Sequence, residues 1–241
     1  MYKDKIVLVT GASKGIGKAI IEFFAKQEAT IIMTYNTNYE LSNKTKEELI
    51  SKYNVNITNY QLDLANEESI NELYKIINNN YRHIDILINN AAISLDNDFN
   101  ELTKEDFMKV LEVNTVGTFL MIKYMSKLMD KKSFIFNISS TDGIDTGSTL
   151  SINYNVSKAG INCMTDTLSR ILEPKIITIC PNWVETESIK DMNQEYLTNE
   201  MKRINQVKLI KPEKIPEVIN ELINNEVESG SIIRIDGDMN E

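Results

Sequence analysis

The feature that most constrains the fold is a glycine-rich turn close to the start of the chain. Residues 10–17 read TGASKGIG, and the preceding run, Ile6–Val9, is short, apolar and rich in β-branched residues, as in a buried strand. After the turn, apolar side chains recur at helical spacing, namely Ile16, Ala19, Ile20, Phe23 and Phe24. A second apolar run follows at Thr30–Thr34. This order predicts the strand–helix–strand unit of a parallel sheet.

The glycines of this turn indicate a phosphate site. Gly11 lets the chain turn sharply off the strand, while Gly15 and Gly17 remove side chains where a pyrophosphate approaches and where the helix packs. The start of a helix also offers free N–H groups and a partial positive charge. A glycine-rich turn can be purely structural, but its place between a strand and an amphipathic helix predicts a dinucleotide site.

Strands and helices alternate along the rest of the chain. Further strands are expected at Ile57–Leu62, Ile84–Ile88, Ser133–Ile138, Ile176–Ile179 and Ser231–Ile235. Helices are expected at Leu41–Tyr53, from a cap at Asn66 to Ile77, from a cap at Thr103 to Leu111, and at Thr115–Met129, Tyr154–Leu172 and Glu213–Asn224. The pattern predicts an α/β fold: a Rossmann-type, doubly wound parallel sheet of about seven strands with helices on both faces, in a single domain spanning residues 1–241.

Three irregular stretches each follow a strand, at Ala91–Leu102, Thr141–Asn153 and Asn182–Lys211. Ligands of open α/β sheets lie beyond the carboxyl ends of the strands. We therefore expect the functional site in these stretches.

Composition narrows the possible functions. The net charge of −9 disfavours nucleic acid and anionic membranes as partners, and no apolar run reaches the ~20 residues that span a bilayer. Cys163 and Cys180 show no redox or metal-ligand spacing, which fits a cytoplasmic protein without a metal site. His83 is the only histidine, so a Ser-His-Asp triad is not expected.

Several segments, in order, resemble the short-chain dehydrogenase/reductase family. GxxxGxG follows the first strand, Asn89–Ala92 resembles an NNAG segment with Ala92 in place of glycine, and PNWVET at Pro181–Thr186 resembles PGxxxT with Asn182 in place of glycine. The resemblance covers essentially the whole chain and implies the catalytic residues Asn114, Ser140, Tyr154 and Lys158. The residues that it and the glycine turn imply for the cofactor are Gly11, Ser13, Lys14, Gly15, Ile16, Gly17, Asn36, Asp63, Leu64, Asn90, Ala91, Ala92, Tyr154, Lys158, Pro181, Trp183, Val184 and Thr186.

The chemistry of such a site explains the Tyr154–Lys158 pair. Four residues apart on one helix, the two side chains project from the same face. A carbonyl that accepts a hydride also needs a proton, and tyrosine titrates near ~10. A nearby ammonium and an oxidised nicotinamide are expected to lower the pKa of Tyr154. Ser140, preferred over Ser139, would donate to the substrate oxygen, and Asn114 is a helix cap, the holder of a proton-relay water, or both.

The nicotinamide cofactor is predicted to be NADP(H) rather than NAD(H). No acidic residue follows the second strand before Glu40, whereas a carboxylate there would bind the ribose 2′-OH of NAD. Lys14 lies within the glycine turn, where relatives with a basic residue tend to use NADP(H), and Asn36 and Thr37 could add hydrogen bonds to a 2′-phosphate.

The substrate is less constrained than the reaction. The chain resembles the 3-oxoacyl-acyl-carrier-protein reductase branch, which implies an acyl thioester and an acidic carrier protein that could meet Lys131, Lys132, Arg170 and Lys175. A free small ketone, a sugar or a steroid-like alcohol is the alternative, and a silent dinucleotide-binding sensor is a third. The resemblance further implies a homotetramer or homodimer, paired through Thr115–Met129 and Tyr154–Leu172.

Overall fold

The computed structural model describes residues 2–237, so Met1 and residues 238–241 of the predicted domain lie outside the description. Seven parallel strands form one sheet in the order β3-β2-β1-β4-β5-β6-β7. The strands are β1 (Ile6–Val9), β2 (Thr30–Tyr35), β3 (Ile57–Gln61), β4 (Ile86–Asn89), β5 (Phe134–Ile138), β6 (Lys175–Pro181) and β7 (Ile232–Ile235). This is the doubly wound sheet that the alternation of elements predicted.

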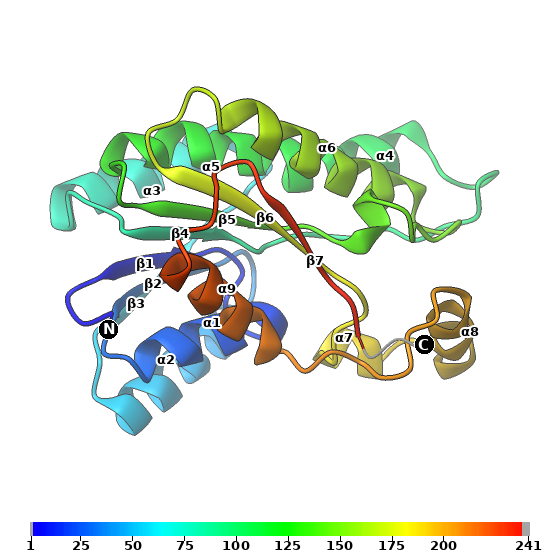
Figure 1. The fold of residues 1–241 in the computed structure, drawn as a ribbon, viewed down its shortest axis with the longest axis horizontal. Helices are drawn as coiled ribbons and strands as arrows, with labels where there is room; N and C mark the ends of the chain where they lie inside the picture. Colours follow the sequence, from blue (N-terminus) through cyan, green and yellow to red (C-terminus); the bar gives the residue numbers. More distant parts are fainter. Residues whose placement is uncertain (1, 238–241) are drawn as a thin grey trace.

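Helices cover both faces of the sheet (Figure 1). On one face lie α1 (Gly15–Ala25), α2 (Tyr39–Tyr53) and α9 (Lys214–Asn224). On the other lie α3 (Glu67–Asn80), α4 (Lys104–Leu111), α5 (Thr118–Met125) and α6 (Ile152–Leu168). The short helices α7 (Glu187–Lys190) and α8 (Gln194–Arg203) lie beyond the sheet edge.

The central strand shows why the strands read as continuous apolar runs. Val7 and Val9 are buried in the core beneath α1 and α9, whereas Leu8 points to the opposite core beneath α3 and α5. Successive side chains of a strand alternate between its two faces. Because helices cover both faces, each of these positions must be apolar.

The sheet topology fixes where a ligand can bind. The chain runs outward from β1 to β2 and β3, then returns to β4 on the other side of β1. Connections therefore leave the carboxyl ends of β1 and β4 in opposite directions, which opens a crevice between them. The glycine turn follows β1, and the loops after β4, β5 and β6 lie at the same edge.

One helix extends further than expected, and one stretch that was expected to be irregular contains helices. The helix expected at Thr115–Met129 is part of a longer helical run that begins at Lys104, widens into a π-helical turn, η1 (Glu112–Gly117), and ends in the 3-10 turn η2 (Ser126–Leu128). The stretch 182–211 is not irregular, because it contains α7 and α8. The caps at Asn66 and Thr103 are confirmed, since each side chain accepts a hydrogen bond from the first turn of its helix. The helix expected from Tyr154 begins two residues earlier and ends at Leu168.

Candidate active site

The glycine turn packs too closely for side chains. Gly11 has φ +63°, and a Cβ there would lie 2.8 Å from the Cβ of Ala91. A Cβ at Gly17 would lie 2.5 Å from the carbonyl oxygen of Gly11, so Gly17 brings α1 against the turn. The residues fit a dinucleotide phosphate, because the turn presents the backbone N–H groups at the start of α1 to a cleft lined by Gly11, Lys14, Gly15 and Ile16.

An acidic side chain already uses one of these donors. The Gly15 N–H donates to Oε2 of Glu187, the first residue of α7, at 3.1 Å. This contact shows that the turn accommodates an anion at the start of α1. A phosphate approaching the same amide would also meet the negative charge of Glu187.

We therefore expect Glu187→Gln to strengthen dinucleotide binding. Removing the charge keeps the side-chain length and reduces repulsion of the phosphate, with an expected gain of several-fold in affinity, on the order of 1 kcal/mol. Fluorescence titration with NADPH measures the dissociation constant. Glu195→Gln, an exposed carboxylate on α8, is the control. Unchanged or weaker binding by Glu187→Gln would contradict the expectation.

We call the part of the cleft that was predicted to hold the adenosine of the cofactor the adenosine end. It brings together most of the residues predicted for it. Lys14, Asn36, Thr37, Asp63 and Leu64 all line this part. Two of the predicted cofactor residues, Ser13 and Gly17, do not line the cleft. Ser13 is absent from the lining, and its carbonyl instead accepts a hydrogen bond from Thr45 Oγ1 at 2.9 Å.

The other end of the cleft lies over the loops after β4 and β6. Its lining includes the predicted residues Ile16, Asn90, Ala92, Tyr154, Lys158, Pro181, Trp183, Val184 and Thr186. Ala91 lines the adenosine half. Asn90 joins this region to the glycine turn, because its Nδ2 donates to the carbonyls of Thr10 at 2.9 Å and Gly11 at 3.0 Å. The buried Gln206, which the sequence did not single out, holds the backbone N–H and carbonyl of Trp183.

Tyr154 and Lys158 come together on α6, as their spacing predicted. Lys158 Nζ lies 5.3 Å from the centroid of the Tyr154 ring and donates to the carbonyl of Ile138 at 2.8 Å. Lys158 is 4% exposed although it lines the cleft. The carbonyl at the end of β5 thus fixes the ammonium beside the phenol.

The pKa of Tyr154 is raised in the structure, whereas the sequence analysis expected it to be lowered. Burial raises the pKa of the phenol above its usual value, the charges of Asp142 and Asp96 raise it further, and a hydrogen bond from Ser140 opposes the change. The expectation that neighbouring positive charge lowers this pKa is not met in the protein alone. The reason is that loss of solvent and the nearby carboxylates together disfavour the phenolate more strongly than the Ser140 hydrogen bond favours it.

Lys158 should leave a signature in the pH dependence of stability. Burial lowers the pKa of Lys158 to about 8, whereas an unfolded lysine titrates near ~10.4. Between these values the unfolded chain binds the extra proton, so the contribution of Lys158 to stability rises with pH. We expect the melting temperature of the wild type to rise relative to that of Lys158→Met between pH 8 and 10. The exposed Lys132→Met is the control, and a pH-independent difference would contradict the expectation.

Ser140 lies beside Tyr154 at the end of β5. Its Oγ accepts the Asp142 N–H at 3.0 Å, so its own proton can be directed to the Tyr154 phenol or to a bound substrate oxygen beside it. The alternative, Ser139, is buried and donates its hydroxyl to the carbonyl of Lys158 at 3.1 Å. This arrangement favours Ser140 as the donor.

Asn114 does not cap a helix, which corrects one of the two interpretations. It lies inside the π-helical turn and is 2% exposed. Its amide exchanges hydrogen bonds with the N–H and carbonyl of Ile93, both at 2.9 Å, and Nδ2 also lies 3.0 Å from Ser157 Oγ. Asn114 therefore ties the loop after β4 to the residue next to Lys158, and it does not itself line the cleft.

Two carboxylates that the sequence reading missed also line the cleft. Asp96 accepts hydrogen bonds from Ser94 at 2.5 Å and Ser151 at 2.8 Å, and Asp142 accepts one from Thr146 at 3.0 Å. Burial raises the pKa of Asp142. Both carboxylates lie in loops that follow strands, where ligands of parallel sheets bind, and this position in the sequence could have identified them.

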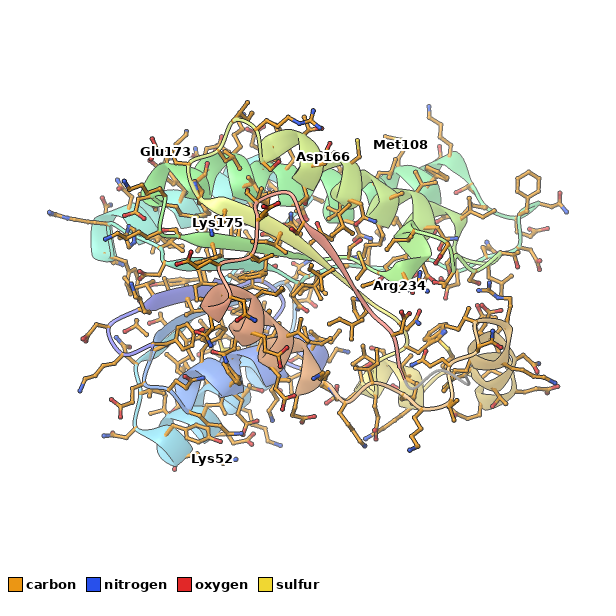
Figure 2. All side chains as sticks on the ribbon, in the orientation of Figure 1. Lys52, Met108, Asp166, Glu173, Lys175 and Arg234 are labelled. Atoms are coloured by element: carbon orange, nitrogen blue, oxygen red, sulfur yellow. The ribbon has the colours of Figure 1, made fainter. Side chains whose placement is uncertain are left out.

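The basic residues considered for a carrier protein lie at the wrong edge. Lys131 and Lys132 precede β5, Lys175 begins β6, and Arg170 lies between α6 and β6, so all four are at the amino ends of the strands. The cleft lies at the carboxyl ends. Figure 2 shows Lys175 at the opposite end of the sheet from Arg234.

Within residues 2–237, no cluster of three potential metal ligands is found. In that same part of the chain, every helix is too short or too polar to cross a membrane.

The fold and the cleft together define a nicotinamide-dinucleotide-dependent oxidoreductase. The pattern of the short chain dehydrogenase family matches residues 5–197. The chain is 34% identical to a 3-oxoacyl-acyl-carrier-protein reductase of Aquifex aeolicus, over 98% of both chains, and 31% identical to glucose 1-dehydrogenase 2 of Bacillus subtilis, over 99% of this chain and 97% of that one. This protein belongs to the short-chain dehydrogenase family and acts on CH–OH or carbonyl groups.

Solved structures share the fold. The L-sorbose reductase of Gluconobacter frateurii, in complex with NADPH and L-sorbose, superposes with a TM-score of 0.88 at 21% identity, covering 98% of this chain and 97% of that one. A short-chain dehydrogenase of Burkholderia cenocepacia in complex with NADP also has a TM-score of 0.88, at 20% identity and 98% coverage of both chains.

Proposed function

We propose that this protein transfers a hydride between NADP(H) and a carbonyl or secondary alcohol, with Tyr154 as the acid/base. One observation carries the proposal: Tyr154, Lys158 and Ser140 line one end of a cleft whose other end is the glycine turn. Tyr154 and Ile16 line both halves, so the two ends are continuous.

In this mechanism the bound nicotinamide supplies or accepts the hydride. Tyr154 donates its proton to the carbonyl oxygen during reduction, and its burial keeps the phenol protonated until then. Ser140 steadies the charge that develops on the same oxygen. Lys158, held by the Ile138 carbonyl, stabilises the phenolate that remains. Asn114 keeps the loop after β4 against α6.

We propose NADP(H) as the cofactor because Lys14 lines the adenosine end of the cleft and its side chain is exposed, so it can meet a 2′-phosphate. Lys14→Ala should weaken NADPH binding by roughly 10- to 100-fold, since a hydrogen bond to a charged group contributes about 1.5–3 kcal/mol. Binding of NADH should change little. Titration of both cofactors measures the ratio, and equal losses for the two would contradict a 2′-phosphate contact.

The sequence relatives favour a 3-oxoacyl thioester as the substrate. The cleft supports a second candidate, a free small ketone that carries hydroxyl groups. Asp96 and Asp142 line the region around Tyr154, and ionised carboxylates only accept hydrogen bonds, so they suit a substrate with donors. The four basic residues at the far edge give no support to a carrier protein docking at this cleft.

A substrate panel tests these alternatives. NADPH and NADH oxidation would be followed with acetoacetyl thioesters, hydroxyketones and plain ketones of matched size. Turnover on thioesters alone supports the first candidate, and turnover on hydroxyketones alone supports the second. Cofactor binding without turnover of any carbonyl would refute the proposed reaction and favour a sensor.

We also propose a homo-oligomer built on the outer face of α4, η1, α5 and α6. This face exposes four large apolar side chains, which are Met108 at 52%, Val116 at 48%, Phe119 at 41% and Val156 at 45%. Met108, labelled in Figure 2, projects outward from α4. Exposed apolar groups gathered on one face suit an interface between copies. Light scattering after size-exclusion chromatography measures the mass, and a monomer would contradict the proposal.

A further inference from the structure

Asn182, which stands where the family resemblance leads one to expect glycine, joins three loops at the carboxyl edge of the sheet. It directly follows β6 and is 6% exposed. Its Oδ1 accepts a hydrogen bond from Thr141 Oγ1, in the loop after β5. Its Nδ2 donates to Oδ1 of Asp236, just after β7, at 2.8 Å. One amide therefore connects the ends of β5, β6 and β7. Since Asn182 is not among the residues with positive φ, the side chain, rather than an unusual backbone, distinguishes this position from glycine.

The contacts of Asn182 continue on both sides. Thr146 Oγ1 lies 2.7 Å from Thr141 Oγ1 and 3.0 Å from Asp142 Oδ1. On the other side, Arg234 donates to Asp236 at 2.7 Å and to Asp145 at 2.5 Å. The loop at 141–146 is therefore held to Asn182 directly through Thr141 and indirectly through Asp145.

This loop carries the polar groups that face Tyr154. Ser140 immediately precedes Thr141, and Asp142 follows it. The opposite side of the loop rests on α6, because a Cβ at Gly143 would lie 2.6 Å from the backbone carbon of Lys158. The loop is thus enclosed between α6 and the Asn182 amide. Without the amide, the buried Thr141 hydroxyl would lose its acceptor, and the exposed Asp236 carboxylate would keep Arg234 but lose its link to the loop after β5. The loop would then lose its outer support.

We propose that Asn182 is a positioning residue of the reaction, which holds Ser140 and Asp142 in place beside the Tyr154 phenol through its bonds to Thr141 and Asp236. The inference rests on the proposed hydride transfer. It adds that the rate of the chemical step depends on the end of the last strand, because Asp236 is one of the two anchors. Cofactor affinity should depend on it much less, since the phosphate-binding turn lies at the other end of the cleft.

A reciprocal exchange of the two partners tests this directly. Asn182→Asp cannot donate to Asp236 and sets two carboxylates against each other, so kcat should fall by 10- to 100-fold. Asp236→Asn alone keeps an acceptor for the Asn182 amide and should change kcat by less than 3-fold. In the double variant, the new amide at 236 donates to the new carboxylate at 182, which still accepts from Thr141. Its kcat should return to within 3-fold of that of Asp236→Asn.

Two further measurements separate positioning from folding. Asn182→Gly removes the side chain without adding charge, and it should lower the single-turnover rate of hydride transfer at saturating NADPH about 10-fold while the KM for NADPH changes less than 2-fold. The pH profile of kcat should also shift, because Ser140 and Asp142 both act on the Tyr154 phenol. Lower melting temperatures with unchanged kcat, or a double variant no better than Asn182→Asp, would overturn the inference. Absence of turnover in the wild type would instead refute the proposed function.

Discussion

Tyr154→Phe is expected to reduce turnover by roughly 10²- to 10⁴-fold, the range that general acid catalysis contributes. The substitution removes one oxygen and leaves a ring of the same shape beside Lys158. The cofactor cleft keeps its glycine turn, so the dissociation constant of NADPH should change by less than a few-fold. The measurements are single-turnover NADPH oxidation and fluorescence titration of the same variant.

The matched control is Tyr53→Phe. Tyr53, on α2, donates its hydroxyl to Glu22, on α1, at 2.8 Å. Neither residue lines the cleft, so loss of the Tyr53 hydroxyl should leave turnover unchanged. If Tyr154→Phe kept wild-type turnover, the acid would have to be another group, and Asp142 would be the next residue to replace. A parallel loss of NADPH binding would show that the phenol holds the cofactor rather than transferring a proton.

Gly17→Ala is expected to disable the cofactor site. Its added Cβ would lie 2.5 Å from the Gly11 oxygen, 2.7 Å from Asn90 Nδ2 and 2.8 Å from the Cα of Ala12. None of these atoms can move freely, since two belong to the backbone and the Asn90 amide is bonded to Thr10 and Gly11. Overpacking of this kind costs about 1–3 kcal/mol. NADPH binding should weaken by roughly 10- to 100-fold, with a lower melting temperature.

Gly160→Ala provides the comparison within the same chain. Gly160 also lies in a helix, but a Cβ there would meet only the Thr115 side chain, at 3.2 Å. Alanine is favoured over glycine in a helix by about 1 kcal/mol, which offsets this contact. NADPH binding should be unchanged in this variant. Equal affinities for Gly17→Ala and the wild type would show that the turn adjusts its backbone.

Local chemistry made part of this structure predictable. The caps at Asn66 and Thr103 depend only on nearby residues, and the strand at 6–9 depends on a short apolar run. The parallel pairing of the strands followed from the alternation of strands and helices, because parallel strands need crossover connections. The helix α8 was missed since Leu197 is its only buried residue, which leaves little apolar periodicity to detect.

The parts that failed depend on tertiary contacts. The sequence places Asn114 before an apolar helical pattern, but the structure places it inside a π-helical turn, where its amide meets Ile93 and Ser157. The raised pKa of Tyr154 reflects burial, which spacing along α6 does not reveal. The position of the basic residues, by contrast, follows from the order of elements in the sequence. Lys131, Lys132 and Lys175 stand just before or at the start of expected strands, and in a parallel sheet that places them away from the ligand edge.

The wide turn at Glu112–Gly117 changes which neighbours one helical run can reach. Segments before and after it are out of phase with each other, since a π-turn takes up one residue more than an α-turn. Before the turn, α4 packs on α6, and after it α5 packs on α3 and β4. A regular α-helix of the same length would present the same face along its whole length, and so could not change its packing partners in this way. One helical run therefore reaches α6 with its first segment and α3 and β4 with its second, without a loop between them. The turn where the contacts change is also where the buried Asn114 amide meets Ser157, the residue before Lys158.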